Sequence, residues 1–345
     1  MIRKPLAHVI IVALFFYGCK KDPILEEPFE PPLCTETFQV KPFTHEVIGF
    51  YPDYRHSKLP VANIRWELLT RIIYAFAVPQ TDGHLTTSSL SAASTLTAAA
   101  HSFGVEAYVS IGGGTGSENF PLAIETQEKR TILIQDLMVF MGNNCFDGVD
   151  VDYEKFNTTG IDAIFTLFME ELYDAITPYG YKIALDVYPS QWGGKKVDDN
   201  IEPFVDYLHI MAYNFSGSWS DPGPHSSYEQ AIGSGSDQNS TGIAYWHSYR
   251  AWDKAKIILG VPFYGRNFDQ NGAAITYDAI IAMDSSAAHV SQWGNIYYDG
   301  LDAIERKAGY IVANQFPGMM IWELAQDVDN PKYSLLYRMD AVLNP

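Results

Sequence analysis

The chain has few cysteines, and its histidines form no pattern typical of a metal centre. Only 3 cysteines and 9 histidines occur among 345 residues, without an HExxH motif or a short His/Cys cluster of the kind that zinc requires. We therefore expect neither a metal nor a cofactor. Basic residues are also scarce, because 23 Lys and Arg face 41 Asp and Glu and give a formal net charge of -18. Nucleic acid would be repelled by this charge, so it is not an expected partner.

The N-terminus lacks an apolar run long enough to span a bilayer. In MIRKPLAHVIIVALFFYGCKKD, Arg3 and Lys4 precede an apolar stretch of only ten residues, 8–17. This pattern predicts an export signal over residues 1–18. A small residue followed by Cys19 at the end of this apolar stretch resembles the lipobox of bacterial lipoproteins. The resemblance implies lipidation of Cys19 and an outer-membrane or cell-surface anchor. A secreted form without lipid is the alternative.

Residues 19–44 are rich in proline and predict an extended tether ahead of the folded domain. Cys34 lies in this tether and Cys145 lies in the domain. In an oxidising compartment the two could pair, or Cys145 could be a small buried hydrophobic residue, and of these two interpretations we favour the second.

Beyond the tether, apolar and β-branched runs alternate with helix-like segments. The helix-like segments at 90–104, 126–144 and 161–176 have apolar residues spaced three and four apart. This alternation predicts a (β/α)8 barrel over residues 45–345, with its site at the carboxyl ends of the strands. The eight predicted strands are 47–51, 71–78, 106–111, 146–153, 182–188, 206–213, 256–263 and 318–324.

An unusual number of acids occupies the fourth predicted strand and the residues directly after it, FDGVDVDYEKF at 146–156. Asp150, Asp152 and Glu154 fall on every second residue, so they line one face of the strand and the residues between them line the other. Because neighbouring buried carboxylates repel, we expect them to share at least one proton. Asp147 breaks the alternation and is interpreted as structural.

DGVDVDYE resembles the DxxDxDxE signature of glycoside hydrolase family 18, which contains the chitinases. The resemblance extends from about residue 47 to 327 and suits a (β/α)8 barrel. It is carried also by GFYPDY at 49–54, YAFA at 74–77, SIGGG at 110–114, MAYN at 211–214, LGVPFYGRNF at 259–268 and MIWELAQD at 320–327.

The resemblance implies retaining, substrate-assisted and endo-acting hydrolysis of β-1,4 bonds between N-acetylglucosamine units in chitin or chito-oligosaccharides. It makes Glu154 the general acid and Asp152 the carboxylate that orients the substrate's 2-acetamido group. Asp150 would share a proton with Asp152 and bond to Ser110, and Tyr213 would donate to the acetamido oxygen.

The same resemblance implies a set of substrate-binding residues. Trp322 would form the hydrophobic floor under the distorted sugar, and Trp219, in a polar loop, is the preferred sugar-stacking platform over Trp192 and Trp293. The other expected members of the binding site are Met211, Asn214, Tyr264, Arg266, Ser110, Phe50, Tyr51, Gly112 and Gly113.

Two positions depart from the family pattern. Phe50 stands where the first-strand motif usually has Tyr, and Asn214 stands where MxYD has Asp. Because Asn carries no charge, we expect altered electrostatics near Glu154 and a shifted pH optimum.

The segment between the last two predicted strands is too short for the full α+β insertion domain of deep-cleft chitinases. Little or no insertion is therefore expected, and residues 294–311 resemble an ordinary strand–helix unit. Two other functions stay open: an endo-β-N-acetylglucosaminidase acting on N-glycan cores, and a lectin-like member without catalysis. The sequence does not give the oligomeric state.

Overall fold

The computed structural model describes residues 29–155 and 161–345. The predicted export signal, Cys19 and the first part of the tether lie outside these residues. Residues 31–345 form one compact unit. No helix in the described ranges has the length and apolar character needed to cross a membrane.

Eight parallel strands close into a barrel in the order β1-β13-β8-β7-β6-β5-β4-β2, and a pairing between β1 and β2 completes the ring. Each predicted strand corresponds to one of them, so the (β/α)8 prediction is confirmed. The bounds are β1 Glu46–Pro52, β2 Arg71–Pro79, β4 Glu106–Gly112, β5 Gly148–Asp152, β6 Lys182–Val187, β7 Tyr207–Ile210, β8 Ile257–Pro262 and β13 Gly318–Trp322.

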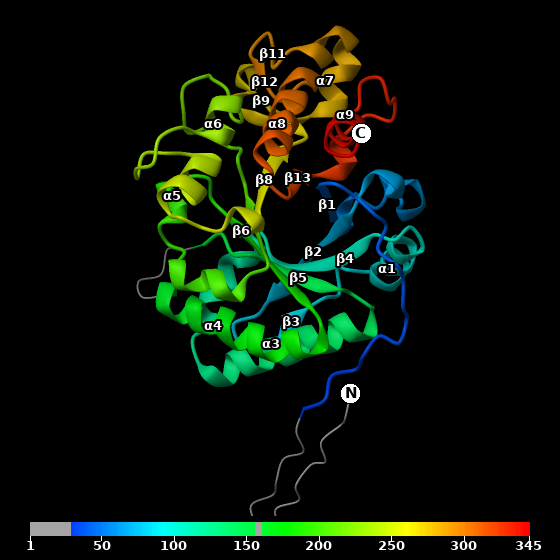
Figure 1. The fold of residues 1–345 in the computed structure, drawn as a ribbon, viewed down its shortest axis with the longest axis vertical. Coiled ribbons are helices and arrows are strands. Elements are labelled where there is room, and N and C mark those ends of the chain that lie inside the picture. Colours follow the sequence, from blue (N-terminus) through cyan, green and yellow to red (C-terminus); the bar gives the residue numbers. More distant parts are fainter. Residues whose placement is uncertain (1–28, 156–160) are drawn as a thin grey trace, which may run out of the picture. The chain divides into compact units, whose positions relative to one another are not determined.

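Helices surround the strands, as Figure 1 shows for α1, α3, α4, α8 and α9. The three helices expected from the sequence correspond to α1, α3 and α4, and Thr126 caps α3 by accepting from the backbone nitrogen of Lys129. The bounds are α1 Ala93–Ser102, α2 Phe120–Ala123, α3 Gln127–Asn143, α4 Ile161–Ile176, α5 Gln191–Gly194, α6 Tyr228–Ile232, α7 Tyr277–Met283, α8 Leu301–Asn314 and α9 Leu335–Leu343.

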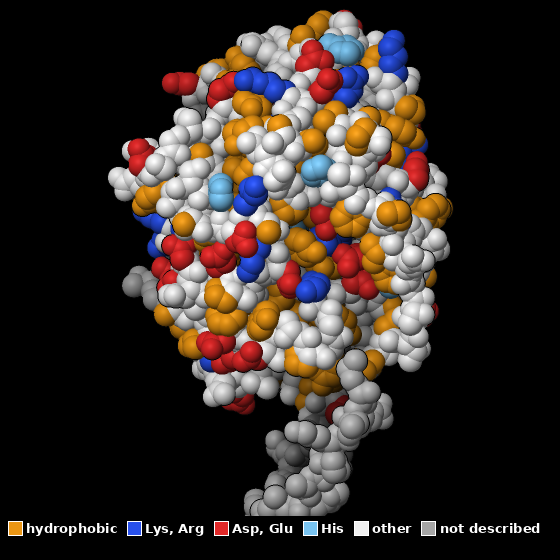
Figure 2. All heavy atoms as spheres, in the orientation of Figure 1, with side chains coloured by type: hydrophobic (Ala, Val, Ile, Leu, Met, Phe, Trp, Pro, Cys, Tyr) orange, Lys and Arg blue, Asp and Glu red, His pale blue; other side chains and the backbone are white. Residues whose placement is uncertain are grey.

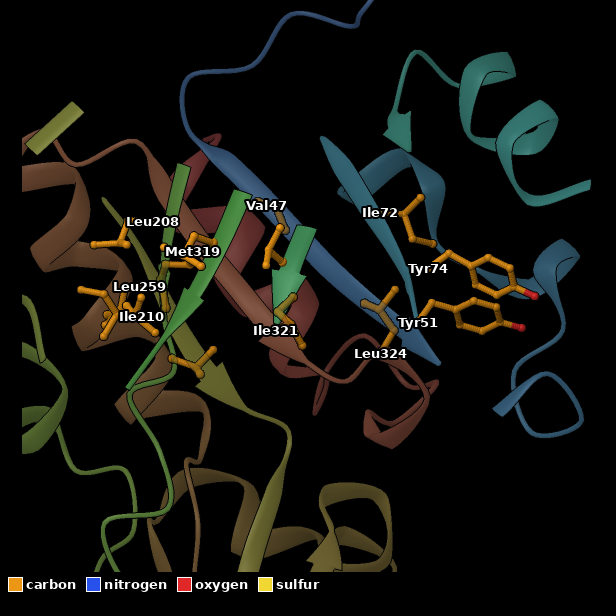
Figure 3. Close-up of a cluster of buried hydrophobic side chains, with 14 of the residues drawn as sticks. Val47, Tyr51, Ile72, Tyr74, Leu208, Ile210, Leu259, Met319, Ile321 and Leu324 are labelled. Carbon is orange, nitrogen blue, oxygen red and sulfur yellow. The ribbon is translucent and has the colours of Figure 1, made fainter. Parts of the chain in front are cut away.

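Apolar side chains fill two regions, one between the strands and the helices and a smaller one inside the barrel. Figure 3 shows part of the first region, where Val47, Ile72 and Met319 lie among other strand residues. Inside the barrel, Arg71 is fully buried and forms ion pairs with Glu46 at 3.0 Å and Glu106 at 2.8 Å. These pairs involve the first residues of β1, β2 and β4, so they lie at the amino ends of the strands.

A small antiparallel sheet follows β8, in the order β10-β9-β12-β11, with α7 inside the same stretch of chain. The insertion is short, as the sequence indicates, but residues 294–311 are not an ordinary strand–helix unit. Within that range β12 pairs with β9 and β11 of the small sheet, and α8 packs on β13 of the barrel. The bounds are β9 Tyr264–Asn267, β10 Ala273–Thr276, β11 Gln292–Trp293 and β12 Ile296–Tyr297; β3, Leu85–Thr86, pairs with β2.

Cys34 and Cys145 form a disulfide with a Cα–Cα distance of 5.0 Å, which contradicts our preference for an unpaired Cys145. The bond attaches the tether to the domain just before β5, at the amino ends of the strands. Lys41 continues the attachment, because its backbone nitrogen donates to the carbonyl of Gly104 at 3.0 Å. Proximity in space, which two isolated cysteines in a sequence do not reveal, decides this pairing.

Candidate active site

A cleft of about 1300 Å³ opens at the carboxyl ends of the barrel strands. It brings together residues that are distant in the sequence, from Asp53, directly after β1, to Trp322, the last residue of β13. Of the residues predicted for the site, those lining the cleft are Gly112, Gly113, Asp152, Glu154, Met211, Tyr213, Asn214, Trp219, Tyr264 and Trp322.

The acids of β5 alternate as the sequence predicts. Val149 and Val151 pack in the outer apolar region, whereas Asp150 and Asp152 lie on the inner face, 0% and 4% exposed. Glu154 follows directly after the strand and lines the cleft. Burial raises the pKa of Glu154 above its ordinary value, so this carboxyl keeps a proton to higher pH, as a general acid requires.

Asp152 lies between the other two acids. Its pKa is raised well above the ordinary value, first by burial and then by the charges of Glu154, Asp186 and Asp150. Within residues 29–155 and 161–345, its buried Oδ1 atom has no hydrogen-bond partner. A buried carboxyl oxygen without a partner is costly, and here it belongs to a residue that lines the cleft.

Asp150 lies deeper, below the cleft lining. Its Oδ2 accepts a hydrogen bond of 2.6 Å from the Ser110 hydroxyl, and its Oδ1 lies 3.1 Å from His209 Nδ1. Ser110 and Asp150 are also register partners on β4 and β5, which explains the contact. The Ser110 bond is the one expected from the family resemblance.

The glycines after β4 allow the backbone to pass close to β5. Gly112 has a φ of 103°, and a Cβ atom there would lie 2.3 Å from the backbone oxygen of Asp152. Gly113 has a φ of 77°, and its Cβ would lie 2.8 Å from the Phe76 ring. Neither position accepts a side chain without strain, which is the physical reason for glycine at the first two of the three glycines in SIGGG.

Aromatic rings form the floor of the cleft. Trp322, at the end of β13, stacks on Phe76 with a centroid distance of 5.7 Å and meets the edge of Phe50 at 5.5 Å. Phe50 is buried beneath this ring and does not line the cleft, so it supports Trp322 instead of contacting a ligand directly.

Asn214 is the centre of a polar network on one wall. Its Oδ1 accepts a hydrogen bond of 2.7 Å from the Tyr264 hydroxyl and another from the Arg266 guanidinium. Arg266 in turn lies over the Trp219 ring, 5.2 Å from its centroid. Arg266 therefore holds two residues that line the cleft without lining it itself.

The three tryptophans proposed as sugar platforms have different places. Trp219 and Trp192 both line the cleft and are 62% and 76% exposed. Trp293 is 37% exposed on β11 and is not part of the lining. The two exposed cleft rings are suited to stacking on a sugar.

Tyr51 was expected to contact substrate, and the structure contradicts this. Its side chain lies on the outer face of β1 and stacks on Tyr74, as Figure 3 shows. Its hydroxyl donates to the backbone oxygen of Leu59 at 2.7 Å. Adjacent strand residues point to opposite sides, so Phe50 and Tyr51 cannot both face the barrel interior.

Sequence reasoning missed three polar residues. The Tyr188 hydroxyl lies 3.3 Å from Glu154 Oε2 and 3.1 Å from its backbone oxygen. Asp186 and His209 lie next to Asp150 inside the barrel. A polar, titratable residue within an apolar strand, as in KIALDVY and DYLHIMAY, was the signal available for the last two.

The surface of the domain carries side chains of both positive and negative charge. Figure 2 shows acidic and basic side chains interspersed with apolar ones on the face drawn. No single-sign basic patch is visible on that face.

Comparisons with known proteins agree with these features. The family model described as glycosyl hydrolases family 18 matches residues 46–327. The chain is 30% identical over 240 residues to a "chitinase-like effector" of Moniliophthora roreri, covering 64% of this chain and 58% of that protein. It is 27% identical over 266 residues to "Endochitinase 1" of Metarhizium robertsii, covering 65% and 62%. The chain thus spans less than two thirds of the length of either relative.

A solved structure is similar over most of the chain. The crystal structure of a chitinase from Bacteroides thetaiotaomicron superimposes with a TM-score of 0.77 at 27% identity, covering 87% of this chain and 96% of that one. The family match spans the whole barrel, from the first residue of β1 to just beyond β13. The chain therefore belongs to glycosyl hydrolases family 18.

Proposed function

We propose that this protein is a chitinase-like glycoside hydrolase. It hydrolyses β-1,4 bonds between N-acetylglucosamine units in chitin or chito-oligosaccharides, with retention of configuration and within the chain. The observation that carries the proposal is the arrangement of Asp152 and Glu154 in one cleft, where Asp152 Oδ1 is buried without a partner among the described residues. In this proposal, that atom accepts from the amide N–H of a 2-acetamido group.

The first chemical step uses the protonated Glu154. Its proton goes to the glycosidic oxygen, the bond from that oxygen to the anomeric carbon breaks, and the acetamido oxygen of the same sugar attacks the anomeric carbon. Asp152 holds the acetamido group in position, and the Tyr213 hydroxyl donates to its oxygen. In the second step water gives a proton to Glu154 and attacks the anomeric carbon, and the bond from that carbon to the acetamido oxygen breaks. This restores the acid and the acetamido group and retains the configuration.

The side chains near Glu154 suit this role. Burial raises the pKa of Glu154, while its hydrogen bond with Tyr188 lowers it. Trp322 provides the apolar surface under the reacting sugar, and Trp192 and Trp219 offer stacking platforms farther along the cleft. The sheet inserted after β8 is small, which is consistent with an open groove and with cuts inside a chain.

We further propose that the protein is exported and anchored by a lipid on Cys19, at the cell surface or the outer membrane. The Cys34–Cys145 disulfide supports export, because such bonds persist in oxidising compartments. Secretion without lipid is the alternative. Mass spectrometry of the mature N-terminus tests this, since a diacylglyceryl-modified Cys19 is expected and an unmodified or uncleaved N-terminus would contradict it.

A non-catalytic glycan-binding function is the second candidate. It is favoured by Asn214, which replaces the aspartate usual in the family, and by the similarity to a protein named a chitinase-like effector. The presence of Glu154 in the cleft favours catalysis instead.

Digestion of chitin oligosaccharides and of a high-mannose glycoprotein, followed by mass spectrometry, tests the proposal. We expect shortened oligosaccharides, and at least a 100-fold lower kcat for Glu154→Gln with oligosaccharide binding retained. Glu128→Gln is the matched control, because Glu128 is exposed at the start of α3, away from the cleft.

Other outcomes identify the alternatives. A glycoprotein left with single N-acetylglucosamine stubs, with chitin oligosaccharides intact, would indicate an endo-β-N-acetylglucosaminidase. Binding without cleavage of either substrate across a broad pH range would indicate the lectin-like function.

A further inference from the structure

A buried lysine connects α8 to the loop that follows β7. Lys307 of α8 is 0% exposed, and its Nζ donates to Asp299 Oδ2 at 2.6 Å, to the backbone oxygen of Ser226 at 2.6 Å and to the Ser226 hydroxyl at 3.0 Å. An ammonium group has three N–H donors and no acceptor, so these contacts use all of its hydrogens. Asp299 and Ser226 are also buried, and none of the three residues lines the cleft.

The Ser226 hydroxyl passes this contact on to the backbone of the cleft. Because Lys307 can only donate, the hydroxyl oxygen accepts from it, and the hydroxyl hydrogen is free for another acceptor. Two acceptors lie nearby: the backbone oxygen of Ala212 at 2.8 Å and Asp299 Oδ2 at 3.3 Å. The Ala212 oxygen is the closer one, and Asp299 Oδ2 already accepts from Lys307. The hydroxyl of Ser226 therefore donates to Ala212.

Ala212 lies in a segment that has left the regular sheet. β7 ends at Ile210, and the following nitrogens bond locally, since Ala212 N donates to the oxygen of Ile210 at 2.8 Å and Tyr213 N to that of Met211 at 2.7 Å. Met211 and Tyr213, on either side of Ala212, both line the cleft. The bond from Ser226 thus holds the carbonyl between two cleft residues.

His225, the residue before Ser226, fastens the next part of the same wall. It is 1% exposed; its Nε2 lies 3.1 Å from the backbone oxygen of Tyr264, and its Nδ1 accepts from the backbone nitrogen of Asn214 at 3.4 Å. A carbonyl oxygen only accepts, so Nε2 carries the ring hydrogen and donates it. The end of this loop therefore holds two cleft segments, at Ala212 and between Asn214 and Tyr264.

We propose that Ser226 and Lys307 are positioning residues of the hydrolytic site: through the Ala212 carbonyl they fix the segment that presents Met211 and Tyr213 to the substrate. This inference rests on the proposed function, in which the Tyr213 hydroxyl donates to the acetamido oxygen of the reacting sugar. Asp299 compensates the buried charge of Lys307 at 2.6 Å, so that the lysine can be placed behind the wall of the cleft.

Ser226→Ala tests the bond to Ala212 directly. It removes the hydroxyl and leaves the backbone oxygen that also accepts from Lys307. We expect kcat on chito-oligosaccharides to fall by about tenfold and KM to change by less than about threefold, because the lost bond positions the reacting sugar's partner while the aromatic platforms stay in place.

Ser334→Ala is the matched control. Ser334 is 1% exposed, its hydroxyl donates to Asp327, and it caps α9 without lining the cleft. This change also removes a buried hydroxyl, so it should lower the thermal midpoint of unfolding while leaving kcat and KM as in the parent.

Hydrogen exchange of the protein without substrate reads the same bond independently of turnover. Mass spectrometry of a peptide that contains residues 211–214 should show amide exchange about tenfold faster in Ser226→Ala, because the segment opens more often once its carbonyl is released. Exchange of this peptide in Ser334→Ala should match the parent.

A second variant tests the lysine. Lys307→Met combined with Asp299→Asn removes the ion pair without leaving a buried charge uncompensated, and it should speed exchange of the same peptide in the same direction. If this variant does not fold, Ser226→Ala alone decides the proposal.

The outcomes separate this inference from the proposed function. If the parent cleaves no substrate, the proposed function fails, while faster exchange in Ser226→Ala still supports the positioning bond. Unchanged exchange in Ser226→Ala, or an equal increase in Ser334→Ala, overturns the inference whatever the digestion shows. Unchanged exchange in a folded variant lacking the ion pair overturns the role of Lys307.

Discussion

Removing the Tyr188 hydroxyl should shift the pH dependence of hydrolysis to higher pH. This hydroxyl lies 3.3 Å from Glu154 Oε2, and the hydrogen bond lowers the pKa of Glu154 against the larger, opposite effect of burial. In Tyr188→Phe the opposing contribution is lost, so the pKa of Glu154 rises further. The general acid then keeps its proton to higher pH, and the basic limb of the kcat/KM profile moves up.

The size of the shift follows from the bond length. A hydrogen bond to a charged group contributes about 1.5–3 kcal/mol, and a bond of 3.3 Å is longer than most O–H···O hydrogen bonds, which favours the lower value. Since about 1.4 kcal/mol corresponds to one pKa unit, we expect the basic limb to rise by about one pH unit. The measurement is kcat/KM against pH with a fluorogenic chito-oligosaccharide.

Tyr51→Phe is the matched control. It removes the same atom from a buried tyrosine whose hydroxyl donates to the Leu59 carbonyl outside the barrel, so its profile should coincide with the parent's. A basic limb that stays or falls in Tyr188→Phe, or that rises equally in Tyr51→Phe, would refute the assignment of Tyr188 as a partner of Glu154.

Three further results are expected. Replacing Cys34 and Cys145 by serine should lower the free energy of unfolding by about 2–5 kcal/mol in urea denaturation, because the bond closes a loop of 111 residues; an unchanged midpoint would contradict a structural disulfide. Trp219→Ala should raise KM for long chito-oligosaccharides more than for short ones, whereas Trp293→Ala, away from the cleft, should leave the ratio unchanged; equal effects would argue against stacking by Trp219. Burial lowers the pKa of His225 to about 3. Below about pH 6.5 the unfolded chain therefore binds a proton at this residue that the folded protein does not bind. Because of this group, the free energy of unfolding should fall by about 1.4 kcal/mol for each unit by which the pH is lowered. His225→Gln should flatten that decline between pH 6 and 4, and an identical slope in both proteins would contradict it.

The sequence by itself determined the barrel and the acidic strand. The eight strands could be predicted because a strand buried on both sides reads as a short apolar run, whatever its neighbours are. The alternation of Asp150, Asp152 and Glu154 could be predicted because side-chain direction along a strand is a local property. The same rule, applied to β1, separates Phe50 from Tyr51, and it is the structure that shows which of them faces inward.

Tertiary structure decided which side chains meet. The pairing of Cys34 with Cys145, the bond from Tyr188 to Glu154, and the placing of Asp186 and His209 beside Asp150 all join segments far apart in the chain. Those contacts depend on strand register and barrel closure, which result from the packing of the whole domain. The sequence of one strand does not specify its register with the neighbouring strand. The acids could therefore be placed on one face of β5 from the sequence, but the side chains that they contact could not be identified.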